Sequence, residues 1–484
     1  MPHRNSVERV NSHDMDLVTN AFRTLSERVR HHHMSPETAK ITNSPSEEWL
    51  SDTERHIPSS KGRSLEDVLR DADEIFSYRM NTMHPQFFAF IPSGATPVSW
   101  LGDSLTSAYN SYAGSSTPGA GVCAVERSMI AWIAERFGLP PSAGGQFVSG
   151  ASMATLTAVA VARDQRLQVE LRHKATVYIS EEAHFCITKA LHIIGLQDFQ
   201  VQTIHCDSKY CMDTDRLRQA ISEDIADGCK PFLVVATCGT TSTGTIDPLS
   251  EIADIADEYG LWMHVDAAYG GSAAFSSAHR SLVSGLGRAD SIAWDPHKWL
   301  FQTYGCGTIL FREKSHPLRS FASTAHFCRD VENETDPQNP WNYGIELTRP
   351  ARHMRLWFSL QVLGMDTIDE MIGRGFELSA LAEGEIKKLA DWVILAPTSL
   401  AIVNFRFAPH GVDERLLDQM NTRVAKDLIA DNIAFILTTH LGGVVGLRMC
   451  TINPRTTDDD IRRVVRALDC SAQAAYGELY RDRK

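Results

Sequence analysis

The stretch DPHKWL, residues 295–300, places a lysine where its amine could react with a carbonyl compound. A short apolar strand pattern, residues 291–294, runs into this stretch, and Lys298 is followed directly by Trp299 and Leu300. Removing a lysine from water lowers its pKa and leaves more of the amine neutral and nucleophilic. We therefore interpret Lys298 as a candidate for covalent attachment of a carbonyl compound.

Two other features lie next to predicted strands. Asp266 ends the strand pattern LWMHVDAA, and a buried carboxylate there needs a partner, either a cation of the protein or a protonated ring nitrogen of a ligand. The small residues from Ser149 to Ser152 precede a helical pattern, and the backbone N–H groups at a helix N-terminus suit a phosphate. An ordinary serine N-cap would explain the same loop, so both alternatives stay open for each feature.

Two histidines also follow strand patterns, His184 after ATVYIS and His297 directly before Lys298. A single histidine is more often a cap or a satisfied polar residue than a catalyst, so neither position decides the matter alone. The combined set is more informative, because it holds an amine nucleophile, a buried carboxylate and a phosphate cradle. These three fit pyridoxal 5′-phosphate (PLP), with its aldehyde on Lys298, its phosphate at the helix N-terminus and its ring nitrogen on Asp266.

These residues can meet only if the elements that carry them form one sheet. From about residue 100, short apolar strand patterns alternate with helical patterns, as in ATVYIS, FQVQTIH, PFLVVAT and LWMHVDAAY. This alternation predicts an α/β fold with a mainly parallel sheet that helices cover on both faces. Ligands bind beyond the carboxyl ends of such strands, so we expect the polar residues there to face one pocket.

The chain divides into three predicted parts. Residues 1–99 are largely polar, with helical patterns around residues 16–30 and in SLEDVLRDADEIF, and residues 100–362 hold the α/β pattern. Residues 363–484 combine helical patterns with the strand patterns LAIVNFRFA and VVGLRMCTI, which predicts a smaller C-terminal α+β domain. Residues 323–347 are polar and poor in periodicity, and a loop of this length is often functional or mobile.

The composition disfavours several classes of partner. The 484 residues carry a net charge of −13 without a block of Lys and Arg, which argues against nucleic acid and anionic membrane as partners. No run of about 18 apolar residues predicts a membrane span, and the N-terminal stretch has no signal-peptide core, so a cytoplasmic protein is expected. The ten cysteines and the histidines lack zinc-ligand spacing, so no metal is predicted.

Six motifs occur in a fixed order over roughly residues 65–470: HPQFFAFIPSG, FVSGASMATLTAVAVAR, SEEAHFCITKA, ATCGTTSTGTIDPL, HVDAAYGGSA and DPHKWL. With these motifs the chain resembles the group II PLP-dependent amino-acid decarboxylases, which include the aromatic-L-amino-acid, glutamate and sulfinoalanine decarboxylases. The resemblance implies a fold-type I, aspartate-aminotransferase-like enzyme that decarboxylates an L-amino acid. It also implies a homodimer with shared active sites, in which the N-terminal helical segment packs on the partner subunit.

The resemblance assigns roles to residues at matching positions. It implies that Lys298 forms the internal aldimine, that Asp266 keeps the pyridine nitrogen protonated, and that His184 stacks on the ring and helps position the substrate carboxylate. Further residues are implied to bind the phosphate (Ala151, Ser152), to contact the cofactor (Thr241, Ala268, His297) and to line the substrate pocket (Phe90, Ile91, Pro92, Ser93). Arg448 matches an arginine near the active site, where it could bind a carboxylate or form an ion pair between domains.

One loop departs from the family pattern. Family members use a tyrosine from a mobile loop of the partner subunit to protonate Cα, but the loop HFCRDVENETDPQNPWNYGIEL has no tyrosine near Gln338 or Asn339. Either Tyr343 takes this role through a shifted loop, or another group donates the proton and Tyr343 packs at the base of the loop. In relatives where that tyrosine is replaced, decarboxylation can be coupled to oxidative deamination. An aldehyde product is therefore the alternative to an amine.

The substrate pocket also leaves alternatives. The stretch HPQFFAFIPSG is closer to the aromatic-amino-acid branch than to the glutamate branch, which favours an aromatic substrate, although Ile91 stands where an aromatic residue is common. A catalytically silent relative that only binds the cofactor is a further alternative. The retention of Lys298, Asp266 and His184 disfavours it.

Overall fold

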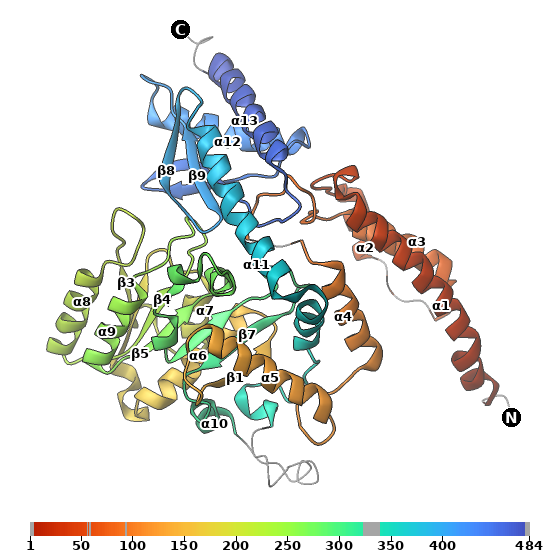
Figure 1. Ribbon diagram of the computed structural model, residues 1–484, viewed down its shortest axis with the longest axis horizontal. Coiled ribbons are helices and arrows are strands. Elements are labelled where there is room, and N and C mark those ends of the chain that lie inside the picture. Colours follow the sequence, from red (N-terminus) through yellow and green to blue (C-terminus); the bar gives the residue numbers. More distant parts are fainter. Residues whose placement is uncertain (1–3, 56, 58–59, 92–93, 323–338, 480–484) are drawn as a thin grey trace.

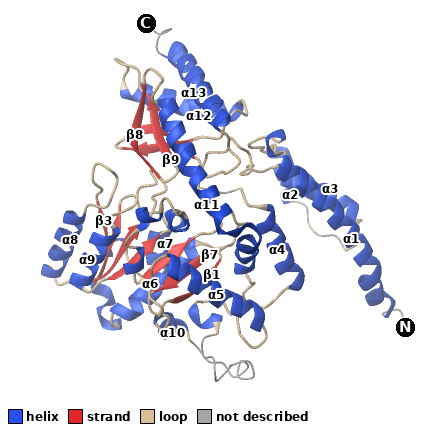
Figure 2. Ribbon diagram, viewed as in Figure 1, coloured by secondary structure: helices blue, strands red, loops and turns tan. Residues whose placement is uncertain are grey.

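The computed structural model describes residues 4–55, 57, 60–91, 94–322 and 339–479 (Figure 1). A seven-stranded sheet forms the centre of the main body, and a four-stranded sheet lies in a lobe beside it (Figure 2). This confirms the predicted fold class, an α/β protein with a smaller C-terminal α+β unit, because the strand patterns between residues 175 and 294 pair in parallel.

The large sheet has the strand order β1-β7-β6-β5-β4-β2-β3. Its strands are β1 (Gly144–Val148), β2 (Ala175–Ser180), β3 (Val201–Ile204), β4 (Lys230–Thr237), β5 (Trp262–Asp266), β6 (Ser291–Trp294) and β7 (Gly307–Phe311). Only β7 runs against its neighbours in this sheet, so the carboxyl ends of the other strands meet at one edge. That edge is where the reactive residues were predicted to lie.

Helices cover both faces of the large sheet. They are α4 (Pro97–Tyr109), α5 (Ala120–Arg136), α6 (Ala151–Arg166), α7 (Cys186–Ile193), α8 (Thr214–Ala226), α9 (Leu249–Tyr259), α10 (His316–Phe321) and α11 (His353–Ile386). Side chains alternate between the faces along each strand. On β4, Val234 and Ala236 join the core under α5, α8 and α9, whereas Leu233 and Val235 join the core under α6 and α7.

The second sheet is antiparallel, with the order β10-β11-β9-β8. It consists of β8 (Trp392–Ser399), β9 (Ile402–Phe407), β10 (Leu437–Leu441) and β11 (Val444–Cys450), packed against α12 (Glu414–Ala430) and α13 (Asp458–Leu479). Helix α11 runs from the main body into this lobe, and Gly364 interrupts it with φ +75° (Figure 1). Strands β8 and β10 were not predicted, because β8 is irregularly paired and β10 is short and half polar.

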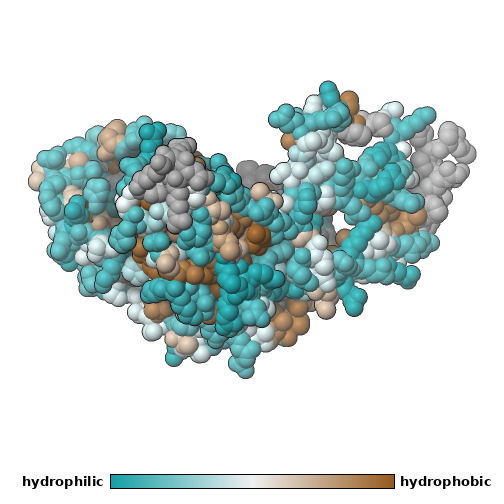
Figure 3. Space-filling view, turned by 90° about the horizontal axis from the view of Figure 1, so that it is seen from above, coloured by the Kyte–Doolittle hydropathy of each residue, from teal (hydrophilic) through white to brown (hydrophobic). Residues whose placement is uncertain are grey.

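Three N-terminal helices form an arm that extends away from the main body (Figure 1). They are α1 (Arg4–Met34), α2 (Glu47–Glu54) and α3 (Leu65–Ser77), and α1 is longer than the predicted helical pattern. The Ser64 hydroxyl caps α3 by accepting a hydrogen bond from the N–H of Asp67 at 3.1 Å. Seen from above, the molecule is hollowed between the body and this arm (Figure 3).

Candidate active site

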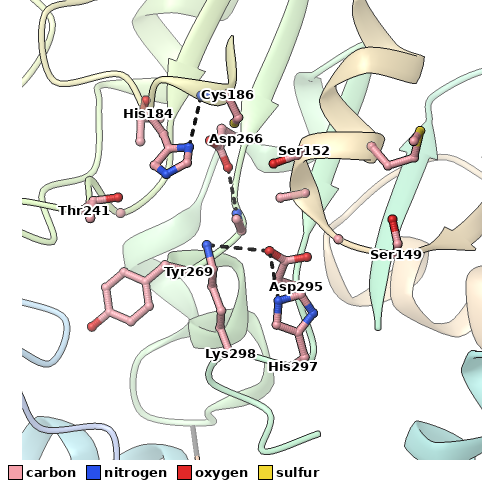
Figure 4. Close-up of a pocket in the computed structure, with 16 residues that line it drawn as sticks. Ser149, Ser152, His184, Cys186, Thr241, Asp266, Tyr269, Asp295, His297 and Lys298 are labelled. Atoms are coloured by element: carbon pink, nitrogen blue, oxygen red, sulfur yellow. Dashed lines mark hydrogen bonds and ion pairs between the residues drawn. The ribbon is translucent and has the colours of Figure 1, made fainter. Parts of the chain in front are cut away.

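A cavity of about 380 Å³ opens at the carboxyl ends of the parallel strands (Figure 4). It is built by the turns that follow β1, β2, β4, β5 and β6. Among the residues that line it are all those predicted to contact the cofactor: Ala151, Ser152, His184, Thr241, Asp266, Ala268, His297 and Lys298. The structure therefore brings together residues spread over more than a hundred positions of the sequence.

Lys298 and His297 both face the carboxylate of Asp295. The Nζ atom of Lys298 and the Nε2 atom of His297 each lie 3.6 Å from Oδ2 of Asp295 (Figure 4). The backbone N–H of Lys298 donates to the carbonyl of Asp295 at 2.9 Å, so a tight turn after β6 fixes the lysine. Nδ1 of His297 lies 2.7 Å from the carbonyl oxygen of Cys306 and so carries the proton of that hydrogen bond.

Asp295 is a site residue that the sequence reasoning did not single out. Its carboxyl is buried, and burial raises its pKa, while Lys298 and His297 act in the opposite direction. Oδ1 of Asp295 is buried without a hydrogen-bond partner in the described part of the chain. The sequence did indicate that Asp295 could belong to the site, because it is a polar residue at the end of the predicted strand, three positions before Lys298.

Asp266 ends β5 and is buried. Its Oδ1 atom accepts a hydrogen bond from the N–H of Ala268 at 3.1 Å. Among the described residues, Asp266 forms no ion pair with a lysine, arginine or histidine. A buried carboxylate without a cation from the protein favours the second alternative from the sequence, a protonated ring nitrogen supplied by a ligand.

His184 follows β2 and faces the same cavity (Figure 4). Its Nδ1 atom accepts a hydrogen bond from the N–H of Cys186 at 3.3 Å, so this nitrogen carries no proton. Burial lowers the pKa of His184; Asp266 opposes this shift and Lys298 adds to it. The ring is therefore kept neutral, with its proton on Nε2.

The turn between β1 and α6 is shaped for an anion. Helix α6 begins at Ala151, so the N–H groups of Ala151 and Ser152 precede the first hydrogen bonds of the helix, which Met153 and Ala154 donate to the carbonyl of Gly150 at 3.0 Å. Gly307 packs directly against this turn: a Cβ atom there would lie 2.5 Å from Cα of Gly150 and 2.7 Å from Oδ1 of Asp295. Only glycine permits this close approach of β7 to the turn.

Comparison with known proteins identifies the family. Residues 48–408 match the pyridoxal-dependent decarboxylase conserved domain. The chain belongs to the pyridoxal-dependent decarboxylase family.

Two curated relatives and one solved structure illustrate the likeness. The decarboxylase is 34% identical over 401 residues to the aromatic-L-amino-acid decarboxylase of Bacillus atrophaeus, which is 82% of this chain and 83% of that protein. It is 34% identical over 351 residues to the L-2,4-diaminobutyrate decarboxylase of Rhizobium meliloti (strain 1021), which is 72% of this chain and 70% of that protein. The crystal structure of Oryza sativa TDC with PLP and tryptamine shares the fold, with a TM-score of 0.90 at 23% identity over 95% of this chain and 98% of that chain.

The predictions of family, cofactor and reaction are confirmed: the protein is a PLP-dependent amino-acid decarboxylase, a carboxy-lyase. The residues of the cavity fit this cofactor. The amine of Lys298 is available for an aldehyde, the unpaired carboxylate of Asp266 suits a ring nitrogen, and the N-terminus of α6 suits a phosphate.

Tyr343 does not line the cavity of Lys298 in the same chain. It ends a short 3₁₀ helix, Pro340–Tyr343, and is buried. It lines a different cavity of about 240 Å³, together with Glu126. The expected position of the family tyrosine near Gln338 falls at the end of residues 323–338, which lie outside the described part of the decarboxylase.

Of the predicted substrate residues, the structure describes Phe90, Ile91 and Arg448, and none of these three is among the residues that line the cavity. Nη1 of Arg448, on β11, donates to the carbonyl of Phe90 at 2.8 Å, and Ile91 is buried. The Nε and Nη2 atoms of Arg448 are buried without hydrogen-bond partners among the described residues. Pro92 and Ser93 lie outside the residues that the structure describes.

Further lining residues were not predicted, among them Cys186, Thr237 and Tyr269. Thr237 ends β4 and Tyr269 follows β5, so the strand-end rule used for Asp266 could have included them. Cys186 begins α7, and burial raises the pKa of its thiol to about 12. The decarboxylase therefore keeps this thiol protonated in the cavity that Lys298 lines.

Proposed function

We propose that the decarboxylase acts on an aromatic L-amino acid and releases the corresponding amine and carbon dioxide. The observation that carries the reaction is the single cavity in which the amine of Lys298, the carboxylate of Asp266 and the imidazole of His184 converge. The aromatic substrate is supported by the relative from Bacillus atrophaeus. It is also supported by the rings of Phe90 and Phe435, which pack edge to face at 6.2 Å beside the Phe90 carbonyl that Arg448 binds.

Each residue of the cavity has a different role in the proposed reaction. When bound, PLP supplies the conjugated ring that accepts electrons as carbon dioxide leaves. In our proposal, the amine of Lys298 would hold the cofactor by its aldehyde and would give up this place to the substrate amine. Asp266 would keep a proton on the ring nitrogen, and His184 would cover the ring and donate from Nε2 to the substrate carboxylate. Ser152 and the first-turn amides of α6 bind the phosphate.

A substrate screen tests this proposal directly. The purified enzyme is incubated with L-amino acids while carbon dioxide, amine, aldehyde and hydrogen peroxide are measured together. We expect aromatic L-amino acids to be consumed, with amine and carbon dioxide formed in equal amounts. L-2,4-Diaminobutyrate is the matched competitor, because one relative bears that name. Preferential consumption of diaminobutyrate or glutamate would show that the aromatic proposal is wrong.

The same screen also shows whether the product is an amine or an aldehyde. Aldehyde formed with ammonia and hydrogen peroxide would show that decarboxylation is coupled to oxidative deamination. The variant Tyr343→Phe then tests the source of the Cα proton. A shift of its product from amine toward aldehyde assigns proton donation to Tyr343. An unchanged product ratio assigns Tyr343 to packing at the base of the loop, as its burial in this chain favours.

We further propose that the active form is a homodimer in which the N-terminal arm packs on the partner subunit. The arm exposes large apolar side chains that a single chain leaves in water: Phe22, Leu25, Val68, Ile75 and Phe76. Light scattering during gel filtration should give twice the chain mass of 53.7 kDa. A monodisperse, active monomer would contradict the proposal.

Mixing two variants, Lys298→Ala and Tyr343→Phe, tests whether the active sites are shared, provided that each forms little amine by itself. If Tyr343 serves the site of the other subunit, dimers of Lys298→Ala with Tyr343→Phe contain one intact site. Random assembly should then restore amine formation to about a quarter of the wild-type rate. No gain over the separate variants would place both residues in one chain's site or remove Tyr343 from catalysis.

The cellular location follows a separate line of reasoning. In the part of the chain that the structure describes, no helix is long and apolar enough to span a bilayer. We propose a cytoplasmic location on the basis of the sequence. Fractionation of the source cells tests it, and recovery of the enzyme with membranes or outside the cell would contradict it.

A further inference from the structure

Phe185 is a large apolar side chain that lies between two residues lining the Lys298 cavity, His184 and Cys186, and 61% of it is exposed. Its ring centroid lies 4.2 Å from that of His184, with 36° between the two ring planes. The Nζ atom of Lys189 lies 4.6 Å from the centroid of the Phe185 ring. The side chains of His184, Phe185 and Lys189 thus form a continuous set of contacts, which we call the rim stack.

The first turn of α7 explains why these side chains meet. Phe185 immediately precedes the helix, and the N–H of Lys189 donates to the carbonyl of Phe185 at 3.2 Å. Residues four positions apart lie on the same side of a helix, which places the ammonium over the phenyl ring. A cation over an aromatic face is attracted by its quadrupole. The turn that presents His184 to the cavity therefore also orients Phe185, which contacts His184, and Lys189, which contacts Phe185.

His184 needs such support because its ring has sparse hydrogen bonding among the residues that the structure describes. One hydrogen bond, from the N–H of Cys186 to Nδ1 at 3.3 Å, determines which nitrogen is protonated. A single bond to one edge of the ring does not determine the plane of the ring. Contact with the face of Phe185 supplies that second restraint.

We propose that Phe185 and Lys189 are positioning residues for His184. The phenyl ring keeps the imidazole plane turned toward the cavity, and the ammonium of Lys189 keeps the phenyl ring in place. This inference rests on the proposed role of His184 in covering the cofactor ring and holding the substrate carboxylate.

Several charged groups face His184 from the surrounding elements. Asp266 at the end of β5 and Asp295 after β6 favour the protonated imidazole, whereas Lys298 after β6 and Lys189 on α7 favour the neutral form. Lys189 is exposed, so salt screens its effect more than that of the buried groups. Lys189 therefore has a second, salt-dependent effect on the same ring.

Substitutions of Phe185 in the holoenzyme test the phenyl ring. Phe185→Leu removes the aromatic face, and we expect kcat to fall about three- to tenfold with a smaller change in KM. Phe185→Tyr keeps the face and should restore kcat to near the wild-type value. The circular dichroism of the visible cofactor band should weaken in Phe185→Leu and recover in Phe185→Tyr, because it reports how the cofactor is held.

Substitution of Lys189 tests the electrostatic part. In Lys189→Met the loss of a positive charge raises the pKa of His184, so the acidic limb of the kcat/KM profile should move to higher pH by about a few tenths of a unit. The shift should shrink at high salt. Lys189→Arg keeps the charge over the ring and should leave the profile unchanged.

Two further variants make the outcomes distinguishable. Phe199 is 74% exposed on the same domain, and Phe199→Leu should leave kcat and the dichroism unchanged. His184→Gln should lose most activity. If it does not, the proposed role of His184 is wrong, and the positioning role of the rim stack, which rests on it, is wrong as well. If His184→Gln is inactive while Phe185→Leu matches wild type in kcat and dichroism, the positioning proposal alone is overturned. Failure of Phe185→Tyr to recover would equally contradict it.

Discussion

The Nζ atom of Lys298 lies 3.6 Å from Oδ2 of Asp295, a carboxylate buried under the turn that carries the lysine. This separation exceeds a good hydrogen bond, so the attraction is between charges. The same oxygen lies 3.6 Å from Nε2 of His297. One buried carboxylate thus attracts both basic side chains on this wall of the cavity, and Asp266 remains available for the cofactor nitrogen.

Asp295→Asn removes this charge and keeps the shape of the side chain. We expect kcat/KM to fall about tenfold, because the Lys298 amine loses the group that holds it in place. Stability should not fall, since burial raises the pKa of Asp295 and thus disfavours its charged form. Steady-state kinetics and thermal unfolding measure the two effects, with Asp254→Asn on the surface as the control. Wild-type kcat/KM in Asp295→Asn would show that this prediction is wrong.

Lys298→Ala should abolish both turnover and covalent attachment of the cofactor. Borohydride treatment of the wild type should add the mass of the reduced cofactor to the chain, because a reduced carbon–nitrogen bond is permanent. The variant should show no added mass in the same intact-mass measurement. Lys314→Ala serves as the control, since Lys314 lines the other cavity. Cofactor trapped in Lys298→Ala would assign the attachment to another lysine.

Arg448→Met should raise KM about ten- to hundredfold if the buried guanidinium binds a carboxylate of the substrate. Its Nε and Nη2 atoms are buried without partners among the described residues, and burial lowers its pKa. Removing a buried cation that lacks a carboxylate should cost little stability. Steady-state kinetics should show the change in KM, whereas Arg415→Met at the surface should show none. A fall in the unfolding temperature with unchanged KM would instead show that Arg448 has a structural role, in which it connects the C-terminal lobe to Phe90.

Arg349→Met should destabilise the fold by about 3–5 kcal/mol, because it leaves a buried carboxylate unpaired. Nη2 of Arg349 lies 2.6 Å from Oε1 of Glu126, and both side chains are buried. The pair also binds the N–H and the carbonyl of Phe147 on the edge strand β1, just before the turn between β1 and α6. Thermal unfolding measures the loss.

The double variant of this pair is the matched control. Arg349→Met with Glu126→Gln removes both charges and should recover part of the lost unfolding temperature. Equal losses in the single and double variants would show that the unpaired charge is not the cause.

His264 should make stability depend on pH. Its side chain is fully buried, and burial lowers its pKa from 6.5 to about 4. The folded state thus resists protonation that the unfolded state accepts. The neutral ring therefore contributes fully to the free energy of unfolding above about pH 6.5. This contribution, about 3 kcal/mol in all, is lost as the pH falls toward 4.

The variant His264→Gln isolates this contribution. Its unfolding free energy, relative to wild type, should rise by up to about 3 kcal/mol between about pH 7 and about pH 4. Denaturant unfolding at the two pH values measures the difference. His173→Gln, at an exposed position, should show no such trend. A difference independent of pH would contradict a depressed pKa at His264.

Several features of the fold and site could be predicted because they are encoded locally. Alternating apolar strands and helices determine a covered parallel sheet, and a parallel sheet brings the carboxyl ends of its strands together. Asp266 and Lys298 each lie at such an end. The hydrophobic period of the strands and the positions of the two residues were therefore enough to predict that they lie close together. The cofactor prediction combined the chemical types of these residues and was sharpened by the motifs.

Other features depended on packing between segments that the sequence does not relate. Arg349 and Glu126 are separated by 223 residues, and no local pattern indicates that their charges cancel in the core. The contact of Phe185 with His184 depends on how α7 begins, and the isolation of Tyr343 from the Lys298 cavity depends on the path of its loop. The sequence by itself determined the sheet and predicted that Lys298 and Asp266 lie at its carboxyl edge, because periodicity and residue type are local properties. Only the tertiary structure decided which buried charges face each other, because those distances arise from the packing of the whole chain.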